Sequence, residues 1–123
     1  MSAGVNKVML LGYLTKDPEK KVTNSGVSIT KIVIAINNQY KKDGEVVKDV
    51  EFIGVTYFNK LADLVYQYVK KGSLVMIEGH LKHEEWKDKN TGENRRKLEV
   101  YGNEITFLDS KTKQEGNLWQ KKK

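Results

Sequence analysis

The 123-residue chain contains no cysteine, one proline and no long hydrophobic run. Without cysteine it cannot form a disulfide, a thiolate metal site or a cysteine nucleophile. The longest apolar runs cover a few residues, as in Val8-Met9-Leu10-Leu11, and are too short to span a membrane. The first residues also lack the basic-then-apolar order of a secretion signal. We therefore expect a cytoplasmic protein without membrane contact.

The charge of the chain is distributed unevenly. Lys and Arg total 22 against 16 Asp and Glu, which gives a net charge of +6. Residues 1–108 hold 17 of these cations and 14 of the anions, whereas residues 109–123 hold 5 and 2. Apolar periodicity also disappears after residue 108. We therefore predict one domain over residues 1–108, followed by a flexible basic tail over residues 109–123.

Most segments of the predicted domain alternate apolar and polar residues with period two, which indicates β-strands. Such segments cover about residues 5–15, 27–40, 50–58, 75–86 and 95–107. Turn residues separate them: Asn24-Ser25-Gly26, then Asp43-Gly44 and Asp88–Gly92, the last two as hairpin tips. The sequence therefore predicts five strands.

One segment has helical spacing instead. Leu61, Leu64, Val65 and Tyr68 form a single apolar stripe, which predicts a helix from Asn59 to Lys71. Asn59 suits the N-cap and Gly72 suits the left-handed position after the C-terminus. Three strands, a short helix and two strands give an all-β protein: a five-stranded Greek-key OB-fold barrel with one helix between strands 3 and 4.

The sequence offers no catalytic or metal-binding constellation that we recognise. It has no G-x-S-x-G elbow, no Walker-type loop and no dinucleotide-type G-x-G-x-x-G. His83-Glu84 begins like a zincin motif, but Lys87 stands where the second histidine is needed. His80 and His83 lie three apart on a predicted strand, so their side chains point to opposite faces. We therefore expect no enzyme, no metal and no cofactor.

The placement of the aromatic residues is more informative. Tyr40, Phe52, Phe58 and Trp86 lie near strand ends or beside charged residues, as in Tyr40-Lys41-Lys42 and Trp86-Lys87. Nucleic-acid bases stack on aromatic rings whatever their identity, while adjacent lysines neutralise the backbone. Phe52 and Phe58 could equally fill the core of a small barrel, and Tyr101 could do either. Together, the aromatic and basic residues favour binding of a single-stranded nucleic acid.

Several strings resemble the bacterial-type single-stranded-DNA-binding proteins. Residues 4–14 (GVNKVMLLGYL), followed by Asp17-Pro18-Glu19, are similar to the opening strand and turn of that family. Phe58-Asn59-Lys60-Leu61-Ala62 resembles the entry to its helix, and residues 69–79 (VKKGSLVMIEG) the exit. Trp86 and the turn Asn90-Thr91-Gly92 match its last hairpin. The resemblance runs in order from about Gly4 to Leu108.

The resemblance implies an OB-fold that assembles into a homotetramer and wraps single-stranded DNA without strong sequence preference. Such a protein protects the strand during replication, recombination and repair. The base-stacking rings would fall on Tyr40, Phe52, Phe58 and Trp86. Contacts to the DNA backbone would fall on Lys7, Lys60 and Lys71.

Three features depart from the family pattern. Ile53 stands where the family often has a histidine near a subunit interface, and Glu84-Glu85 stand where basic residues commonly precede the final tryptophan. The chain ends in Leu118-Trp119-Gln120-Lys121-Lys122-Lys123 instead of the acidic tip that docks replication and recombination proteins. Recruitment of those partners is therefore in question. The alternatives are an OB-fold that binds RNA, a primosome-type accessory module, and a barrel that docks another protein.

Overall fold

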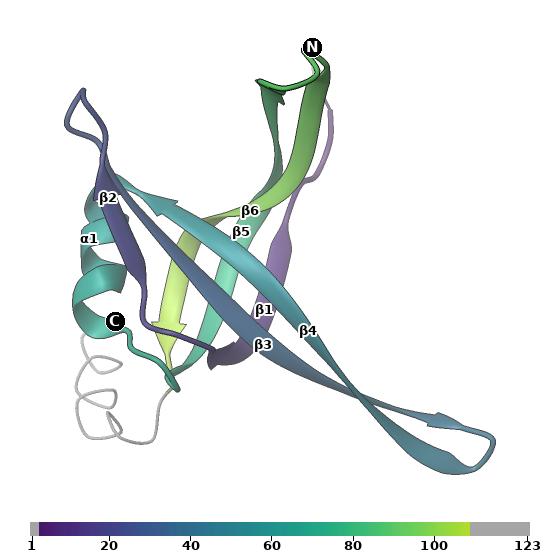
Figure 1. Ribbon diagram of the computed structural model, residues 1–123. Coiled ribbons are helices and arrows are strands. Elements are labelled where there is room, and N and C mark those ends of the chain that lie inside the picture. Colours follow the sequence, from purple (N-terminus) through teal and green to yellow (C-terminus); the bar gives the residue numbers. More distant parts are fainter. Residues whose placement is uncertain (1–2, 109–123) are drawn as a thin grey trace.

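The computed structural model describes residues 3–108, which form six strands and one helix (Figure 1). The elements are β1 (Val8–Leu14), β2 (Glu19–Val22), β3 (Ser28–Lys42), β4 (Glu45–Phe58), α1 (Asn59–Tyr68), β5 (Leu74–Lys87) and β6 (Asn94–Phe107). The predicted tail, residues 109–123, lies outside the described part of the chain. Within that part, no helix has the length and apolar character needed to cross a membrane.

Five of the strands close into a barrel. The sheet order is β1-β5-β6-β4-β3, and β1 pairs again with β3 through Tyr13–Ala35 and Leu14–Ile34. The predicted five-stranded barrel with one short helix between its third and fourth strands is therefore confirmed. One strand pair of the barrel is parallel: β4 and β6 run in the same direction where Val55 and Thr56 meet Val100 and Tyr101.

The strand β2 was not predicted. Its four residues pair with the first residues of β3, from Glu19–Lys31 to Val22–Ser28. All four side chains are exposed, so no apolar alternation marks this segment in the sequence. It lies beside α1 at the end of the barrel that the helix covers (Figure 1).

The barrel encloses one apolar core, formed by Leu14, Ile32, Ile34, Val55, Tyr57, Ala62, Val65, Val69, Val75, Ile77, Val100 and Ile105. Its largest side chain, Tyr57, is fully buried, and its hydroxyl donates to the carbonyl oxygen of Glu104 at 3.4 Å. Burial raises the pKa of Tyr57. Gly102 faces this ring, and a Cβ at that position would overlap it. The close approach explains why residue 102 is glycine.

The helix differs from the prediction at both ends. The N-cap is Phe58, without a side-chain cap hydrogen bond, while Asn59 adopts a positive φ of 62°. Asparagine tolerates this backbone conformation better than most residues, so it turns the chain sharply from β4 into α1. The helix ends at Tyr68, because Val69 is extended (φ −108°) and buried in the core. Gly72 has a positive φ, but in the turn before β5 rather than directly after the helix.

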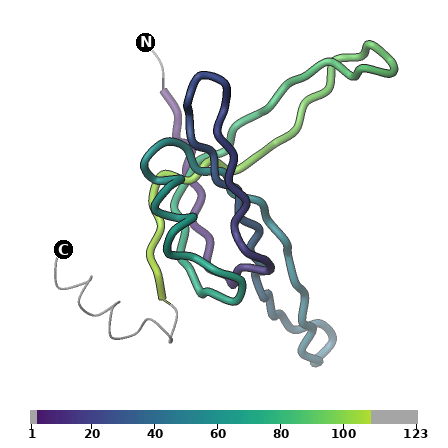
Figure 2. Tube along the Cα trace, turned by 60° about the vertical axis from the view of Figure 1, so that its left-hand side comes forward, coloured from purple at the N-terminus to yellow at the C-terminus, as the bar shows by residue number. Residues whose placement is uncertain are grey.

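Two hairpins extend beyond the barrel as arms (Figures 1 and 2). The β3–β4 arm comprises residues 37–50, and its tip is the predicted Asp43-Gly44 turn, with both residues at positive φ. The β5–β6 arm comprises residues 82–98 and turns at residues 88–93. Nearly all arm side chains are exposed, and the two arms diverge from the barrel (Figure 2).

Candidate nucleic-acid interface

One outward face of the barrel runs across β3, β4, β6 and β5. On β4, Phe52 and Phe58 alternate with the core residues Val55 and Tyr57, so their side chains point outward. Residues paired across neighbouring strands project to the same side of the sheet, so this face continues over β3, β6 and β5. The pairs that extend it are Lys31–Thr56, Thr56–Tyr101, His80–Tyr101, Glu84–Lys97 and Trp86–Arg95. We call this set the aromatic face; its members are Lys31, Phe52, Thr56, Phe58, His80, Glu84, Trp86, Arg95, Lys97, Glu99 and Tyr101.

Three rings form a contact series at the centre of the aromatic face. The ring centroids of Phe58 and Tyr101 are 4.9 Å apart, with an interplanar angle of 64°. Tyr101 meets His80 at 5.8 Å and 75°. Phe58 is half-buried in this arrangement, yet it points away from the core. Burial and the nearby carboxylates of Glu99 and Glu84 raise the pKa of Tyr101.

Phe52 and Trp86 lie to either side of these rings. Phe52 is 66% exposed where β4 enters its arm, and its cross-strand partner is Ala35. Trp86 is 46% exposed near the tip of the β5–β6 arm. Of the four predicted stacking residues, the structure therefore places Phe52, Phe58 and Trp86 on one face. The alternative that Phe52 fills the core does not apply, because its side chain lies outside the barrel.

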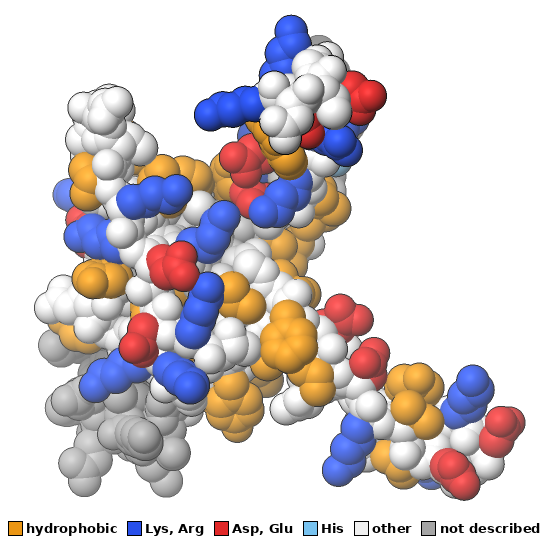
Figure 3. Space-filling view, in the orientation of Figure 1, with side chains coloured by type: hydrophobic (Ala, Val, Ile, Leu, Met, Phe, Trp, Pro, Cys, Tyr) orange, Lys and Arg blue, Asp and Glu red, His pale blue; other side chains and the backbone are white. Residues whose placement is uncertain are grey.

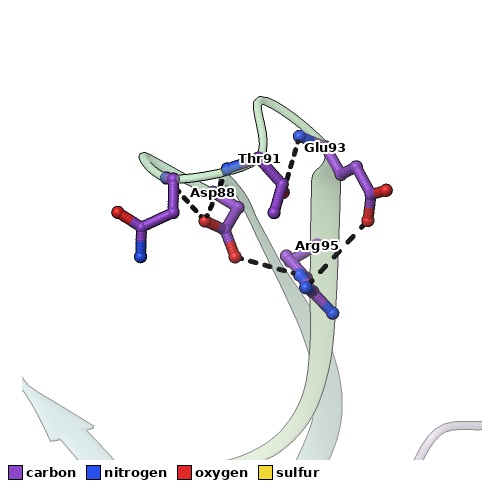
Figure 4. A network of polar contacts seen from close by, with 5 residues as sticks. Asp88, Thr91, Glu93 and Arg95 are labelled. Atoms are coloured by element: carbon purple, nitrogen blue, oxygen red, sulfur yellow. Dashed lines mark hydrogen bonds and ion pairs between the residues drawn. The ribbon is translucent and has the colours of Figure 1, made fainter.

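A polar network holds the tip beside Trp86 (Figure 4). The Asp88 carboxylate accepts hydrogen bonds from the backbone N–H groups of Asn90 (2.8 Å) and Thr91 (3.2 Å). Its other oxygen accepts from Arg95 Nε at 3.3 Å. These backbone hydrogen bonds are the main reason that the pKa of Asp88 lies below its ordinary value. Because Arg95 pairs with Trp86 across the strands, the network fixes a cation beside the exposed ring.

Tyr40 occupies a different position. It is 51% exposed on the β3–β4 arm and pairs with Val47. Along β3 its side chain shares a face with Ile34 and Ile36, whereas the partner of Phe52 is Ala35, on the opposite face. Tyr40 therefore lies on the reverse side of the two-stranded ribbon from Phe52.

The three predicted lysines are spread over the molecule. Lys7 precedes β1, and its Nζ lies 2.6 Å from Glu78 Oε1, an ion pair that raises the pKa of the lysine. Lys60 is exposed in the first turn of α1, two residues after Phe58. Lys71 follows the helix, and its backbone N–H donates to Asp17 Oδ1 at 2.9 Å. Within residues 3–108, the side chains of Lys60 and Lys71 form no ion pair.

An open groove of about 480 Å³ lies between β2 and the aromatic face, with Phe58 and Tyr101 in its wall. Lys20, Lys21 and Lys31 also line it. In Figure 3, basic side chains gather over the part of the barrel that carries β2 and β3, with carboxylates among them. The groove thus combines aromatic rings and cations, as a single-strand binding surface requires.

The buried carboxylate of Glu99 forms ion pairs with two nearby lysines, Lys31 and Lys97. The Glu99 side chain is 8% exposed, and its Oε1 lies 3.1 Å from Lys97 Nζ and 3.6 Å from Lys31 Nζ. Burial raises the pKa of Glu99, but hydrogen bonding with Lys97 and Glu84 and the charge of Lys31 together bring it below its ordinary value. Glu99 therefore stays charged and holds both lysines on the aromatic face.

Sequence reasoning did not assign Tyr101, Lys97 or Glu99 to the site. Their alternation along β6 is visible in the sequence, but it does not reveal which strand they face. Only the parallel β4–β6 pairing brings Tyr101 against Phe58.

Comparison with known proteins gives a consistent result. Residues 5–108 match the single-strand binding protein family. A single-stranded DNA-binding protein of Wolinella succinogenes is 42% identical over 112 residues, covering 90% of this chain and 68% of that protein. One from Borreliella burgdorferi is 34% identical over 108 residues, covering 88% and 72%.

Solved structures agree on the fold. A deletion mutant of the single-stranded DNA binding protein from Thermus aquaticus superposes with a TM-score of 0.80 at 25% identity; the match covers 91% of this chain and 54% of that one. The Plasmodium falciparum SSB, solved in complex with ssDNA, gives a TM-score of 0.77 at 22% identity and covers 89% and 99%. By sequence and by fold, the chain belongs to the single-strand binding protein family.

Proposed function

We propose that the protein binds single-stranded DNA on the aromatic face, with bases stacked on Phe52, Phe58 and Trp86. The observation that carries this proposal is the continuous outward row of rings across β4, β6 and β5, with Phe52 and Trp86 widely exposed. The names of the Wolinella and Borreliella relatives support the same ligand. The activity is binding without catalysis, and a DNA ligand agrees with the cytoplasmic setting expected from the sequence.

The chemistry of the face explains low sequence preference. Every base offers a π-face, so stacking on a ring contributes about 1–3 kcal/mol per base with little regard to identity. Lys31, Lys97 and Arg95 lie among the rings and can neutralise the phosphates that follow the bases. Such a complex protects the strand from reannealing and attack, which suits replication, recombination and repair.

The remaining predicted contacts belong to the same proposal. Lys60 lies two residues after Phe58, and its ammonium group, which forms no ion pair with any residue of the described range 3–108, is available to a phosphate. Lys7 and Lys71 would contact the DNA backbone further along the path of the bound strand. Tyr40 can stack a base only if the strand passes around the edge of the β3–β4 arm.

We further propose that the protein assembles with copies of itself, as a homotetramer. Met9, Leu11 and Tyr13 of β1 are 61%, 48% and 48% exposed, and Met76 pairs with Leu11 on the same outward side. A row of exposed apolar side chains on adjacent strands is typical of an interface. Sedimentation tests this directly: the protein should sediment as a tetramer, and Leu11→Glu should dissociate it. A monomeric wild type would contradict the assembly.

The test of the site uses a single-stranded oligo-dT and three alanine variants, one of which is a control. We expect Phe52→Ala and Trp86→Ala each to weaken binding about 5-fold or more, because each removes one stacking platform. Tyr68→Ala removes an exposed ring on α1 and should leave affinity unchanged. Equal affinity in all three variants would place the DNA elsewhere. Competition with oligo-U distinguishes a DNA-binding from an RNA-binding protein.

A further inference from the structure

His80 belongs to the aromatic face, but the proposed function assigns it no role. Its imidazole lies against the ring of Tyr101, with centroids 5.8 Å apart, and Phe58 contacts the other side of the series. The imidazole is therefore the polar end of a row of three rings. It is half-buried, so part of it stays open to a ligand on this face. A phosphate that follows a base stacked on these rings would meet the imidazole first.

A β-bulge fixes the orientation of the imidazole. The register of β5 and β6 shifts between Glu78 and Gly79, which leaves Asn103 of β6 as an extra residue without a partner on β5. The side-chain oxygen of Asn103 lies 2.8 Å from His80 Nδ1. An amide oxygen only accepts hydrogen bonds, so Nδ1 carries a proton and donates it. The bulge thus assigns one ring nitrogen and holds the ring in place.

The other ring nitrogen, Nε2, is the atom that can change its state. None of the hydrogen bonds within residues 3–108 involves His80 Nε2. In the neutral ring this nitrogen is an acceptor, which does not bind a phosphate oxygen. Protonation turns it into a donor and gives the ring a positive charge. Histidine ordinarily makes this change between pH 5 and 8, so a phosphate contact at His80 would depend on pH.

The charged neighbours of His80 are compatible with a phosphate contact. Six other titratable side chains lie around the imidazole by strand register, two on β5, three on β6 and one before β1: Glu78, Lys82, Glu99, Tyr101, Glu104 and Lys7. The carboxylates favour a protonated imidazole, and those of Glu78 and Glu99 are already paired with lysines. Tyr101 has a raised pKa, so its phenol stays neutral where histidine titrates.

We infer that His80 contacts the DNA backbone only in its protonated form, so that binding of single-stranded DNA takes up a proton at this residue. The inference rests on the proposed function and adds a residue and a regulation to it. Because the phosphate favours the charged ring, the complex holds more protons than the free protein. Affinity should therefore rise as the pH falls through the range in which the imidazole becomes charged.

The test measures Kd for oligo-dT, of about ten nucleotides, at several pH values between about 5.5 and 8. Neither thymine nor the phosphodiester titrates in this range, so a change in affinity belongs to the protein. The wild type should bind about 3- to 10-fold more tightly at the lower pH, the gain of one charged over one neutral hydrogen bond. His80→Gln keeps a donor for Asn103 but cannot become charged, so it should lose most of this pH dependence.

His83→Gln is the matched control, because His83 is the other histidine of the chain. It is exposed, lies on the opposite side of β5 and pairs with Leu98. This variant should keep the pH profile of the wild type. A second measurement needs no variant: in NMR titrations of the wild type, saturation with oligo-dT should move the titration midpoint of the His80 ring protons to higher pH and leave that of His83 nearly unchanged.

The outcomes separate the inference from the function on which it rests. Tight binding by the wild type with the same Kd at every pH would overturn the proton-linked contact and leave the DNA site intact. A pH profile that persists in His80→Gln, or that disappears equally in His83→Gln, would also overturn it. Failure of the wild type to bind oligo-dT at any pH would contradict the proposed site itself. Thermal unfolding should show that both variants are folded.

Discussion

The ring of Phe58 packs edge-on against the ring of Tyr101, with centroids 4.9 Å apart, although 42 residues lie between them in the sequence. Phe58 ends β4 and Tyr101 lies in β6, so the contact depends on the one parallel strand pair of the described barrel. The pair lines the groove. We expect the two rings to give a stacked base a larger platform than a single exposed ring would.

Replacement of Phe58 by alanine should weaken binding of oligo-dT by about 1–3 kcal/mol, because it removes a stacking surface and frees Tyr101 to move. Fluorescence anisotropy of a labelled oligonucleotide measures the change. Phe58→Leu keeps apolar packing against Tyr101 but has no π-face, so it should lose most of the same affinity while remaining as stable as the wild type. Full affinity in the leucine variant would show that the ring packs but does not stack.

Gly102→Ala should destabilise the fold by about 1–3 kcal/mol or more, because its Cβ would overlap the buried Tyr57 ring. Denaturant unfolding measures this loss. Gly4→Ala, where a Cβ meets no atom within 4 Å, should cost little. The double variant Tyr57→Leu/Gly102→Ala should be more stable than the sum of the single changes predicts. Additive losses would contradict a direct clash.

The charge of Asp88 should stabilise the protein only above a limiting pH. Its pKa in the folded state lies below the ordinary 3.8, so ionisation favours folding above that pH and the gain disappears as pH falls through the folded pKa. Asp88→Asn keeps an oxygen acceptor for the Asn90 and Thr91 N–H groups but removes the charge. The variant should therefore be less stable than the wild type near neutral pH. Denaturant unfolding at a series of pH values should show this difference disappearing in acid; a constant difference would contradict the assignment.

Removal of residues 109–123 should reduce the salt dependence of DNA binding. This segment carries five lysines and two acidic residues, half of the net charge of +6. Each lysine that contacts a phosphate of a single strand contributes about −0.7 to the slope of log K against log salt. Titrations at several salt concentrations compare the full chain with residues 1–108. Identical slopes would show that the segment does not contact DNA.

The barrel and its hairpins were predictable from the sequence, whereas the short strand β2 and the exact ends of the helix were not. Alternation in residues 27–40 and 50–58 and the Asp43-Gly44 turn predict the β3–β4 hairpin, because its register follows from the turn itself. The short strand β2 has no apolar face, and the positive φ of Asn59 leaves no pattern in the sequence. The helix end was misplaced because core burial of Val69 overrides the helical spacing that precedes it.

The residues of the candidate site likewise divide into those that the sequence identifies and those that it does not. The exposed ring of Trp86 could be identified from its neighbours along the chain, since Glu85 and Lys87 flank it, whereas Phe52 was assigned only by the family resemblance. Tyr101 and Glu99 could not, because their roles depend on which strands β6 joins. The reverse placement of Tyr40 likewise follows from strand parity and register, which composition does not reveal.

The central claim is that DNA bases stack on the aromatic face, and the fluorescence of Trp86 tests it most directly. The chain has two tryptophans, Trp86 and Trp119, so the Trp119→Phe variant leaves Trp86 as the sole tryptophan, whose emission is followed with selective excitation of tryptophan over tyrosine. Titration of this variant with oligo-dT, with binding followed independently by sedimentation, should quench its emission strongly and saturably. Tight binding that leaves Trp86 emission unchanged would contradict the account.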